Sequence, residues 1–86
     1  MASYSVEFSA NVRKDFRNIP NADAERILGK IHELAATPRP SGSKKLKGEE
    51  LYRIRVGAYR VVYEIEDKRW VVFIVRVKHR KEAYRF

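Results

Sequence analysis

Hydrophobic and polar residues alternate at the start of the chain, over residues 4–8, which predicts a half-buried β-strand. Ser9 can then cap a short helix that places Val12, Phe16 and Ile19 on one stripe. A proline follows Ile19 and ends this helix, because the residue before a proline is disfavoured in the helical conformation. The chain is therefore predicted to open with a strand and a short helix.

A second, longer helix is predicted to follow, with Asn21 as its N-terminal cap and Thr37-Pro38 as its end. Its apolar residues recur at helical spacing: Ala24, Ile27, Leu28, Ile31, Leu34 and Ala35. Charged residues occupy the opposite side: Glu25, Arg26, Lys30 and Glu33. This helix is amphipathic, so we expect it to bury one face against the rest of the domain.

The second half of the chain has the pattern of a sheet. Residues 38–48, PRPSGSKKLKG, have the composition of a loop. Three apolar-rich segments then predict strands at residues 51–56, 59–66 and 70–78. Turns at Gly57-Ala58 and at residues 67–69 join them. The order β-α-α-β-β-β predicts a small α+β fold, a single domain over residues 1–86, with the helices on one face of a mostly antiparallel sheet and a short C-terminal tail.

A two-residue turn at Gly57-Ala58 determines how the first two strands of this meander pair, and it places Arg55 opposite Arg60. Side chains alternate between the two faces of a strand. One face of the hairpin is therefore apolar: Tyr52, Ile54, Val56, Tyr59, Val61, Tyr63 and Ile65. The opposite face collects Arg53, Arg55 and Arg60. We expect the apolar face to pack on the helices.

The third strand is predicted to pair with Glu66 opposite Trp70, which puts Arg76 opposite Arg60. A slip by one residue would bury Arg76 and expose Phe73, so this register is favoured. The helix-facing residues are then Val71, Phe73, Val75 and Val77. The basic face then holds Arg53, Arg55, Arg60, Arg76 and Lys78. Three apolar residues share it and suggest that a partner docks there: Val62, Val72 and Ile74.

The formal net charge of +8 comes from the second half of the chain. Residues 1–38 carry five basic and five acidic side chains, whereas residues 39–86 carry 14 basic and 6 acidic ones. A basic field confined to one part of a small domain points to a polyanion, whereas a solubilising surface would intersperse the two signs. The chain has no cysteine, no signal pattern and no apolar run long enough for a membrane span, so we expect a cytoplasmic protein without a membrane partner.

The arginine face favours a bound anion. Like charges directly opposite on a sheet destabilise it by up to about 1 kcal/mol per pair. Surface ion pairs with nearby glutamates are the alternative, but the acids on this face are too few to neutralise the cluster. The guanidinium fork matches phosphate with two hydrogen bonds. Three lysines lead into the sheet, Lys44, Lys45 and Lys47, and can either contact phosphate or stay solvated.

The C-terminal residues 77–86, VKHRKEAYRF, add His79, Arg80 and Tyr84 where the last strand ends. Tyr84 and His79 have plausible acid–base chemistry near the cluster, because surrounding cations favour a phenolate and imidazole is a common proton carrier. Two histidines far apart in the sequence and no local acidic cluster make a poor metal site. We therefore expect neither a metal nor a cofactor.

Three stretches together resemble the RelE/ParE toxin family, the toxins of type II toxin–antitoxin modules: YSVEFSANVRKDF, KLKG with LYRIRVGAYRVVYEI, and VKHRKEAY. The G-x-Y-R-x-V-Y core is specific for the superfamily, which contains both ribosome-dependent mRNA endonucleases and gyrase poisons. On the RelE side, the resemblance implies metal-independent cleavage of mRNA in the ribosomal A site. The 2′-hydroxyl attacks its own phosphate and leaves a 2′,3′-cyclic phosphate.

The resemblance also implies a role for individual residues. Arg60 matches the family's phosphate-stabilising arginine, and Arg53 and Arg55 occupy the two basic positions of the preceding strand, where RelE-type members often have lysine. Arg80 matches the basic residue of the closing motif, on the proton-donating side, and Tyr84 matches the tyrosine after it, the candidate base. Six residues are expected to contact substrate: Lys44, Lys45, Lys47, Arg76, Lys78 and His79. His79 is also an alternative to Arg80 as the proton donor and to Tyr84 as the base.

Three functions remain open at this point. The first is a RelE-like mRNA interferase that acts on mRNA and ribosome (rRNA). A non-covalently bound antitoxin would silence it by covering the basic face, in a complex that can form higher oligomers on operator DNA. The second is a ParE-like gyrase inhibitor without nuclease activity, and the third is a non-catalytic RNA-binding module. Arg80 and Tyr84 beside the arginine face favour the first, because a gyrase poison has no need of a base at a phosphate cluster.

Overall fold

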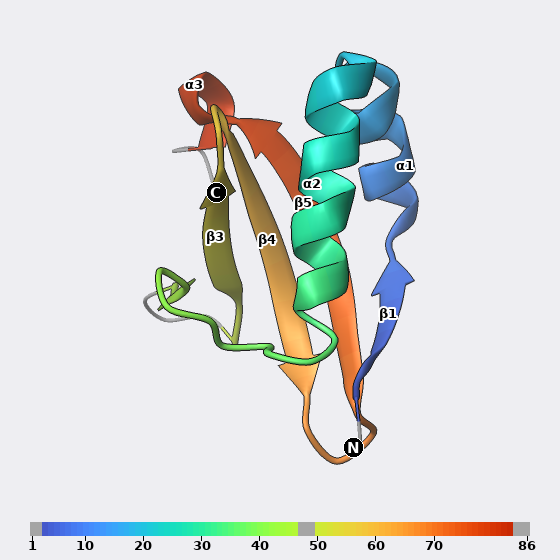
Figure 1. Cartoon of the computed structure of the whole chain (residues 1–86), viewed down its shortest axis with the longest axis vertical. Helices are drawn as coiled ribbons and strands as arrows, with labels where there is room; N and C mark the ends of the chain where they lie inside the picture. The colour runs from blue at the N-terminus through green and yellow to red at the C-terminus, as the bar shows by residue number, and fades with distance from the viewer. Residues whose placement is uncertain (1–2, 47–49, 84–86) are drawn as a thin grey trace.

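Two helices cover one face of a sheet (Figure 1). The computed structural model describes residues 3–46 and 50–83. Over these residues the elements are β1 (Ser5–Phe8), α1 (Ala10–Arg17), α2 (Asn21–Glu33), β2 (Lys44–Lys45), β3 (Tyr52–Val56), β4 (Tyr59–Glu66), β5 (Val71–His79) and α3 (Arg80–Ala83). The strands lie in the order β1-β5-β4-β3-β2, with β1 parallel to β5 and all other neighbours antiparallel. The predicted α+β fold is confirmed, with β2 and α3 as additional short elements.

Helix α1 is fixed to the sheet by its predicted cap. The Ser9 hydroxyl accepts a hydrogen bond from the Val12 N–H at 3.2 Å and donates one to the Val75 carbonyl at 2.7 Å. The first bond satisfies an N–H group that would otherwise lack a partner at the helix start. The second joins that helix start to β5. One serine therefore both begins α1 and positions it over the sheet.

The predicted cap of α2 is wrong by one residue. Pro20 is the N-cap, with φ −55° and ψ 146°, and Asn21 is already the first helical residue. The Asn21 side chain therefore makes no capping bond, whereas the Pro20 carbonyl accepts the Ala24 N–H at 2.9 Å. The helix ends at Glu33, a few residues before the predicted stop, and turns carry the chain on to Pro38.

The core lies between the two helices and the sheet. Its fully buried side chains include Val12, Ile27, Ile31, Leu34, Val61, Tyr63, Val72 and Ile74. Tyr63 is the largest of them, and its hydroxyl donates to the Pro38 carbonyl at 2.8 Å. This bond ties the loop after α2 to the middle of β4. Burial raises the pKa of the Tyr63 phenol to about 12.

The predicted β3–β4 hairpin is confirmed residue for residue. Val56 faces Tyr59, and Arg55 faces Arg60. Gly57 has φ +60° and is followed by a residue with ordinary negative φ, as in a type II′ turn. Glycine takes that conformation without strain, and the two-residue turn leaves no freedom in the pairing that follows.

The predicted register of β4 with β5 is wrong. Glu66 faces Val71 rather than Trp70, because the turn is one residue longer than predicted and ends at Trp70, which has a left-handed backbone at φ 57°. The shift turns Phe73 away from the helices, since a one-residue slip exchanges the two faces of a strand. A bulge at Val75, between the pairs Tyr63–Ile74 and Val62–Arg76, then restores the predicted inward direction of Val77. Arg60 consequently faces Lys78 instead of Arg76.

The apolar strip predicted on the basic face does not exist. Val72 and Ile74 are fully buried in the core beneath the helices. Val62 does lie on the basic face, but it is only 2% exposed, between flanking cations. The outward apolar residues are instead Val71 and Phe73, at the far end of β5, beside glutamates of β1 and β4. The outer face is therefore divided into a basic end and an acidic end.

Candidate functional site

The basic end of the outer face is built by the β3–β4 hairpin. Arg53 and Arg55 alternate with buried Ile54, so they project away from the helices. Arg60 joins them from β4, directly opposite Arg55. None of these three arginines forms an ion pair with any residue in the described ranges 3–46 and 50–83. The predicted cluster is therefore present and carries its positive charge unneutralised within these ranges.

Arg60 is the most constrained member of the cluster. Its Nε atom is buried and has no hydrogen-bond partner in the part of the chain that the structure describes. Burial, and then the charges of Arg53 and Arg55, lower the pKa of its guanidinium. A buried donor without an acceptor is unfavourable, because it has lost its hydrogen bonds to water. An anion bound by the Arg60 guanidinium would relieve the repulsion from Arg53 and Arg55.

A hollow of about 460 Å³ lies beside Arg60. It is lined by Arg55, Gly57, Tyr59, Arg60, Arg80 and Lys81. Helix α3 brings the last two residues there, because the Arg80 N–H donates to the Ala58 carbonyl in the hairpin turn at 2.7 Å. Arg80, a residue of the closing motif, is thus placed near the arginines of the hairpin. Tyr84 lies outside the described residues.

Two predicted substrate contacts are engaged with a carboxylate instead. Arg76 donates two hydrogen bonds of 3.0 Å to Asp15 of α1, and the Lys78 Nζ lies 3.9 Å from the same carboxylate. The Val77 N–H donates to Asp15 as well, at 2.9 Å. The hydrogen bond from Asp15 raises the pKa of Arg76. This pair joins α1 to β5 just after the bulge.

His79 lies on the opposite side of the sheet from the arginines. It pairs with Tyr59 on the helix-facing side, and the two rings meet edge to face at 5.3 Å between centroids. Its Nδ1 accepts the Lys81 N–H at 3.2 Å, within the turn that starts α3. It lines a separate hollow near Asp15. The geometry therefore does not bring His79 together with Arg60.

The predicted lysines divide into three cases. Lys44 of β2 pairs with Arg53 and extends the basic face by one strand. Lys45 points elsewhere and lies 3.6 Å from the carboxylate of Glu50. Lys47 is outside the described residues. Lys44 is therefore the lysine of the three that the structure places with the cluster.

Sequence reasoning missed two residues of this region. Lys81 lines the hollow beside Arg60, and its position next to Arg80 in the closing motif was a usable signal. Asp15 was missed because nothing in a helical pattern marks the acid that reaches a strand 61 residues further on. No group of three His, Cys, Asp or Glu side chains able to hold a metal ion occurs within residues 3–46 and 50–83. Within the same ranges, no helix is long and apolar enough to cross a membrane.

Comparisons with known proteins identify the family of this chain. A family model described as the ParE toxin of the type II toxin–antitoxin system parDE matches residues 6–84. The putative toxin RelE1 of Methanocaldococcus jannaschii is 30% identical over 86 residues, which cover 95% of this chain and 96% of that protein. The mRNA interferase toxin RelE of Escherichia coli is 28% identical, with 95% and 90% covered.

A solved structure shows the same fold. The archaeal RelE–RelB complex from Pyrococcus horikoshii OT3 contains a chain that superposes with a TM-score of 0.81 at 33% identity, covering 92% of this chain and 97% of that one. The family model, the relatives and the superposition each span most of the chain, and the range of the family model includes the hairpin and the closing motif. The chain therefore belongs to the RelE/ParE superfamily of toxins of type II toxin–antitoxin systems.

Proposed function

We propose that this toxin is a ribosome-dependent, metal-independent endoribonuclease that cleaves mRNA in the ribosomal A site and thereby inhibits translation. The observation that carries the proposal is the cluster of Arg53, Arg55 and Arg60, which forms no ion pair within the described residues. A hollow lined by Arg55, Arg60 and Arg80 lies beside it. The relative from Escherichia coli is named an mRNA interferase, which supports the same chemistry.

The reaction needs three groups around one phosphate. A base takes the proton of the 2′-hydroxyl while the 2′-oxygen forms a bond to phosphorus. Cations stabilise the charge that gathers on the phosphoryl oxygens in the pentacoordinate state. A proton donor protonates the 5′-oxygen as its bond to phosphorus breaks, which leaves a 2′,3′-cyclic phosphate. Because the nucleophile is the 2′-hydroxyl, RNA is the substrate and DNA is not.

The residues of this chain fit these roles unequally. Arg60, Arg53 and Arg55 supply the fixed positive charge, and Arg60 does so from a position held rigidly by the hairpin. Tyr84 is assigned as the base by its place in the closing motif. Arg80 is assigned to the leaving oxygen in preference to His79, because Arg80 lines the hollow beside Arg60 and His79 faces the helix side.

The partners follow from the same family. The Pyrococcus horikoshii relative was solved as a RelE–RelB complex, and this chain is proposed to bind a cognate antitoxin non-covalently. The unneutralised basic end of the outer face is the surface that an acidic antitoxin segment would cover. Ribosomes carrying mRNA are the site of action, which places the toxin in the cytoplasm. The toxin–antitoxin complex is also proposed to form higher oligomers on operator DNA.

One observation supports a second function: the matching family model is described as a ParE toxin. A resemblance to ParE implies gyrase inhibition without nuclease activity. Expression of the chain with mapping of mRNA 5′ ends on translating ribosomes separates the two. Cuts inside codons, abolished by Arg60→Ala and by Tyr84→Phe, are expected for the endoribonuclease. Arg13→Ala, an exposed arginine of α1, is the matched control and should cleave normally. Intact mRNA together with DNA damage would overturn the proposal in favour of the gyrase function.

A further inference from the structure

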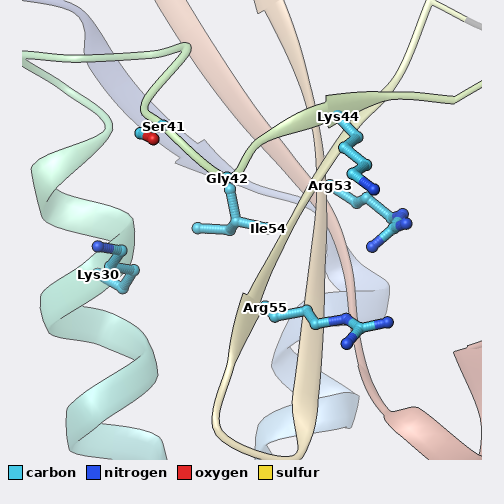
Figure 2. Close-up of a pocket in the computed structure, with 7 residues that line it drawn as sticks. All are labelled: Lys30, Ser41, Gly42, Lys44, Arg53, Ile54 and Arg55. Carbon is cyan, nitrogen blue, oxygen red and sulfur yellow. The ribbon is translucent and has the colours of Figure 1, made fainter.

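A second basic pocket lies at the edge of the sheet, on the other side of Arg55 from the hollow beside Arg60. Its volume is about 400 Å³, and its walls include Lys30 of α2, Ser41 of the following loop, Lys44 of β2, and Arg53, Ile54 and Arg55 of β3. Figure 2 shows Ile54 pointing toward α2, while Lys44, Arg53 and Arg55 project to the opposite side of the strand. The pocket therefore bends around the edge of β3, with cations on both sides of it.

The edge is accessible because β2 is short. It pairs only with Tyr52 and Arg53, so within the described residues no strand lies alongside the rest of β3, up to Val56. An extended chain can pass over this part of the edge from the Arg55 side to Lys30. The apolar side chain of Ile54, 3% exposed, forms the floor between the two sides.

All charged residues that line this pocket are positive. Four of its lining residues are cations and none is acidic: Lys30, Lys44, Arg53 and Arg55. Lys30 lies 3.5 Å from Glu33, but both side chains are well exposed, and an exposed pair of this kind contributes 1 kcal/mol or less. Within the described ranges, Lys44 forms no ion pair. Among the residues that the structure describes, an incoming anion therefore competes with one weak internal pair.

Arg55 lines both this pocket and the hollow beside Arg60, so one ligand can occupy both. Two neighbouring basic hollows that share one arginine suit a strand that carries a phosphate on every nucleotide. We propose that the edge pocket binds the phosphate of the nucleotide next to the cleaved one, with Lys30 and Lys44 as its contacts. This assignment rests on RNA being the ligand of the arginine cluster. Under this assignment, Lys30 is a substrate-binding residue, although no pattern in the sequence marks it.

The test uses the purified full-length chain and two labelled 2′-O-methyl RNA probes, which lack the attacking hydroxyl and cannot be cleaved. A tetranucleotide can reach both pockets, and a dinucleotide with one internal phosphate reaches only one. Binding is measured by fluorescence anisotropy across a series of KCl concentrations for wild type, Lys30→Gln and Lys44→Gln. Lys68→Gln, an exposed lysine in the β4–β5 turn, is the matched control.

Each lysine that contacts a phosphate should lower the slope of log K against log salt by about 0.7, which is about fivefold in affinity at roughly 0.1 M salt. We expect this loss for Lys30→Gln and Lys44→Gln with the tetranucleotide, but not for Lys30→Gln with the dinucleotide or for Lys68→Gln. Equal losses for Lys30→Gln and Lys68→Gln would show a general field and refute the pocket. Equal losses on both probes would refute a separate second phosphate.

The remaining outcomes separate this inference from the proposed function. If Lys30→Gln leaves RNA binding unchanged but weakens inhibition by an antitoxin, the pocket belongs to a protein partner and the inference fails. If wild type binds neither probe, the inference fails as well. If the lysine-dependent slope is found but mRNA stays intact on ribosomes, the edge pocket stands and the endoribonuclease function fails.

Discussion

Removal of the Asp15 carboxylate should destabilise the fold more than any exposed substitution. The side chain of Asp15 is 8% exposed and accepts three hydrogen bonds of 2.9–3.0 Å, two from Arg76 and one from the Val77 N–H. Asp15→Ala leaves both donors without a partner. Removing one partner of a buried ion pair destabilises a protein by about 3–5 kcal/mol. Because Arg76 is 26% exposed and can turn to solvent, we expect about 2–4 kcal/mol here.

For a domain of this size, that loss corresponds to a decrease in Tm of roughly 10–25 °C. The assay is urea unfolding followed by far-UV circular dichroism, with every variant made in an Arg60→Ala background so that the toxin can be expressed. Asp15→Asn keeps an oxygen acceptor but loses the charge, so it should fall between Asp15→Ala and the parent. Glu25→Ala, an exposed carboxylate of α2, is the matched control and should change the free energy of unfolding by about 0.5 kcal/mol or less.

A loss for Asp15→Ala no larger than that for Glu25→Ala would refute the reasoning. A double variant, Asp15→Leu with Arg76→Leu, sharpens the test. Replacing both partners of a buried pair by apolar groups is often close to neutral, so the double variant should be more stable than Asp15→Ala alone. A double variant as unstable as Asp15→Ala would mean that packing of α1, and not the unpaired charge, causes the loss.

Three further predictions concern charge, backbone strain and pH. Arg55→Gln removes the charge opposite Arg60 and should raise the free energy of unfolding by up to about 1 kcal/mol at low salt, while it lowers mRNA cleavage. An unchanged free energy of unfolding at low salt would contradict repulsion between Arg55 and Arg60. Trp70→Gly should be more stable than Trp70→Ala by about 1 kcal/mol, since φ 57° strains a residue with a Cβ, and equal stabilities in urea unfolding would argue against strain. Burial raises the pKa of Tyr63 to about 12, so its stabilising contribution is complete below pH about 10 and is lost as the pH rises through 12. In unfolding curves at alkaline pH, Tyr63→Phe should not show this decrease in stability.

The arginine cluster and the Asp15 pair have opposite effects on stability. Arg55 and Arg60 face each other without a carboxylate between them in the described residues, which destabilises the hairpin. Arg76 and Lys78 could have added to that repulsion, but Asp15 draws both toward α1. The cluster therefore stays confined to the hairpin and α3, where the proposed reaction takes place.

Local patterns predicted the parts of the fold that depend on neighbouring residues. The register of the β3–β4 hairpin followed from the two-residue turn after Val56, and alternation along each strand then placed the arginines on one face and Ile54 in the core. The same logic failed for β5, because a turn one residue longer and a bulge at Val75 are not visible in the apolar pattern. The longer turn alone explains why Phe73 does not face the helices and why Val72 and Ile74 do not lie on the basic face.

The sequence by itself thus determined the fold class, the hairpin and the gathering of Arg53, Arg55 and Arg60, because turn length and strand alternation act over a few residues. Only the tertiary structure decided which cations remain available for an anion. Arg76 is paired because Asp15, far away along the chain, packs beside it, and His79 is excluded from the cluster by the strand face it shares with Tyr59. Lys30 enters the edge pocket because α2 packs beside β3, and such long-range packing leaves no periodic signal in the sequence.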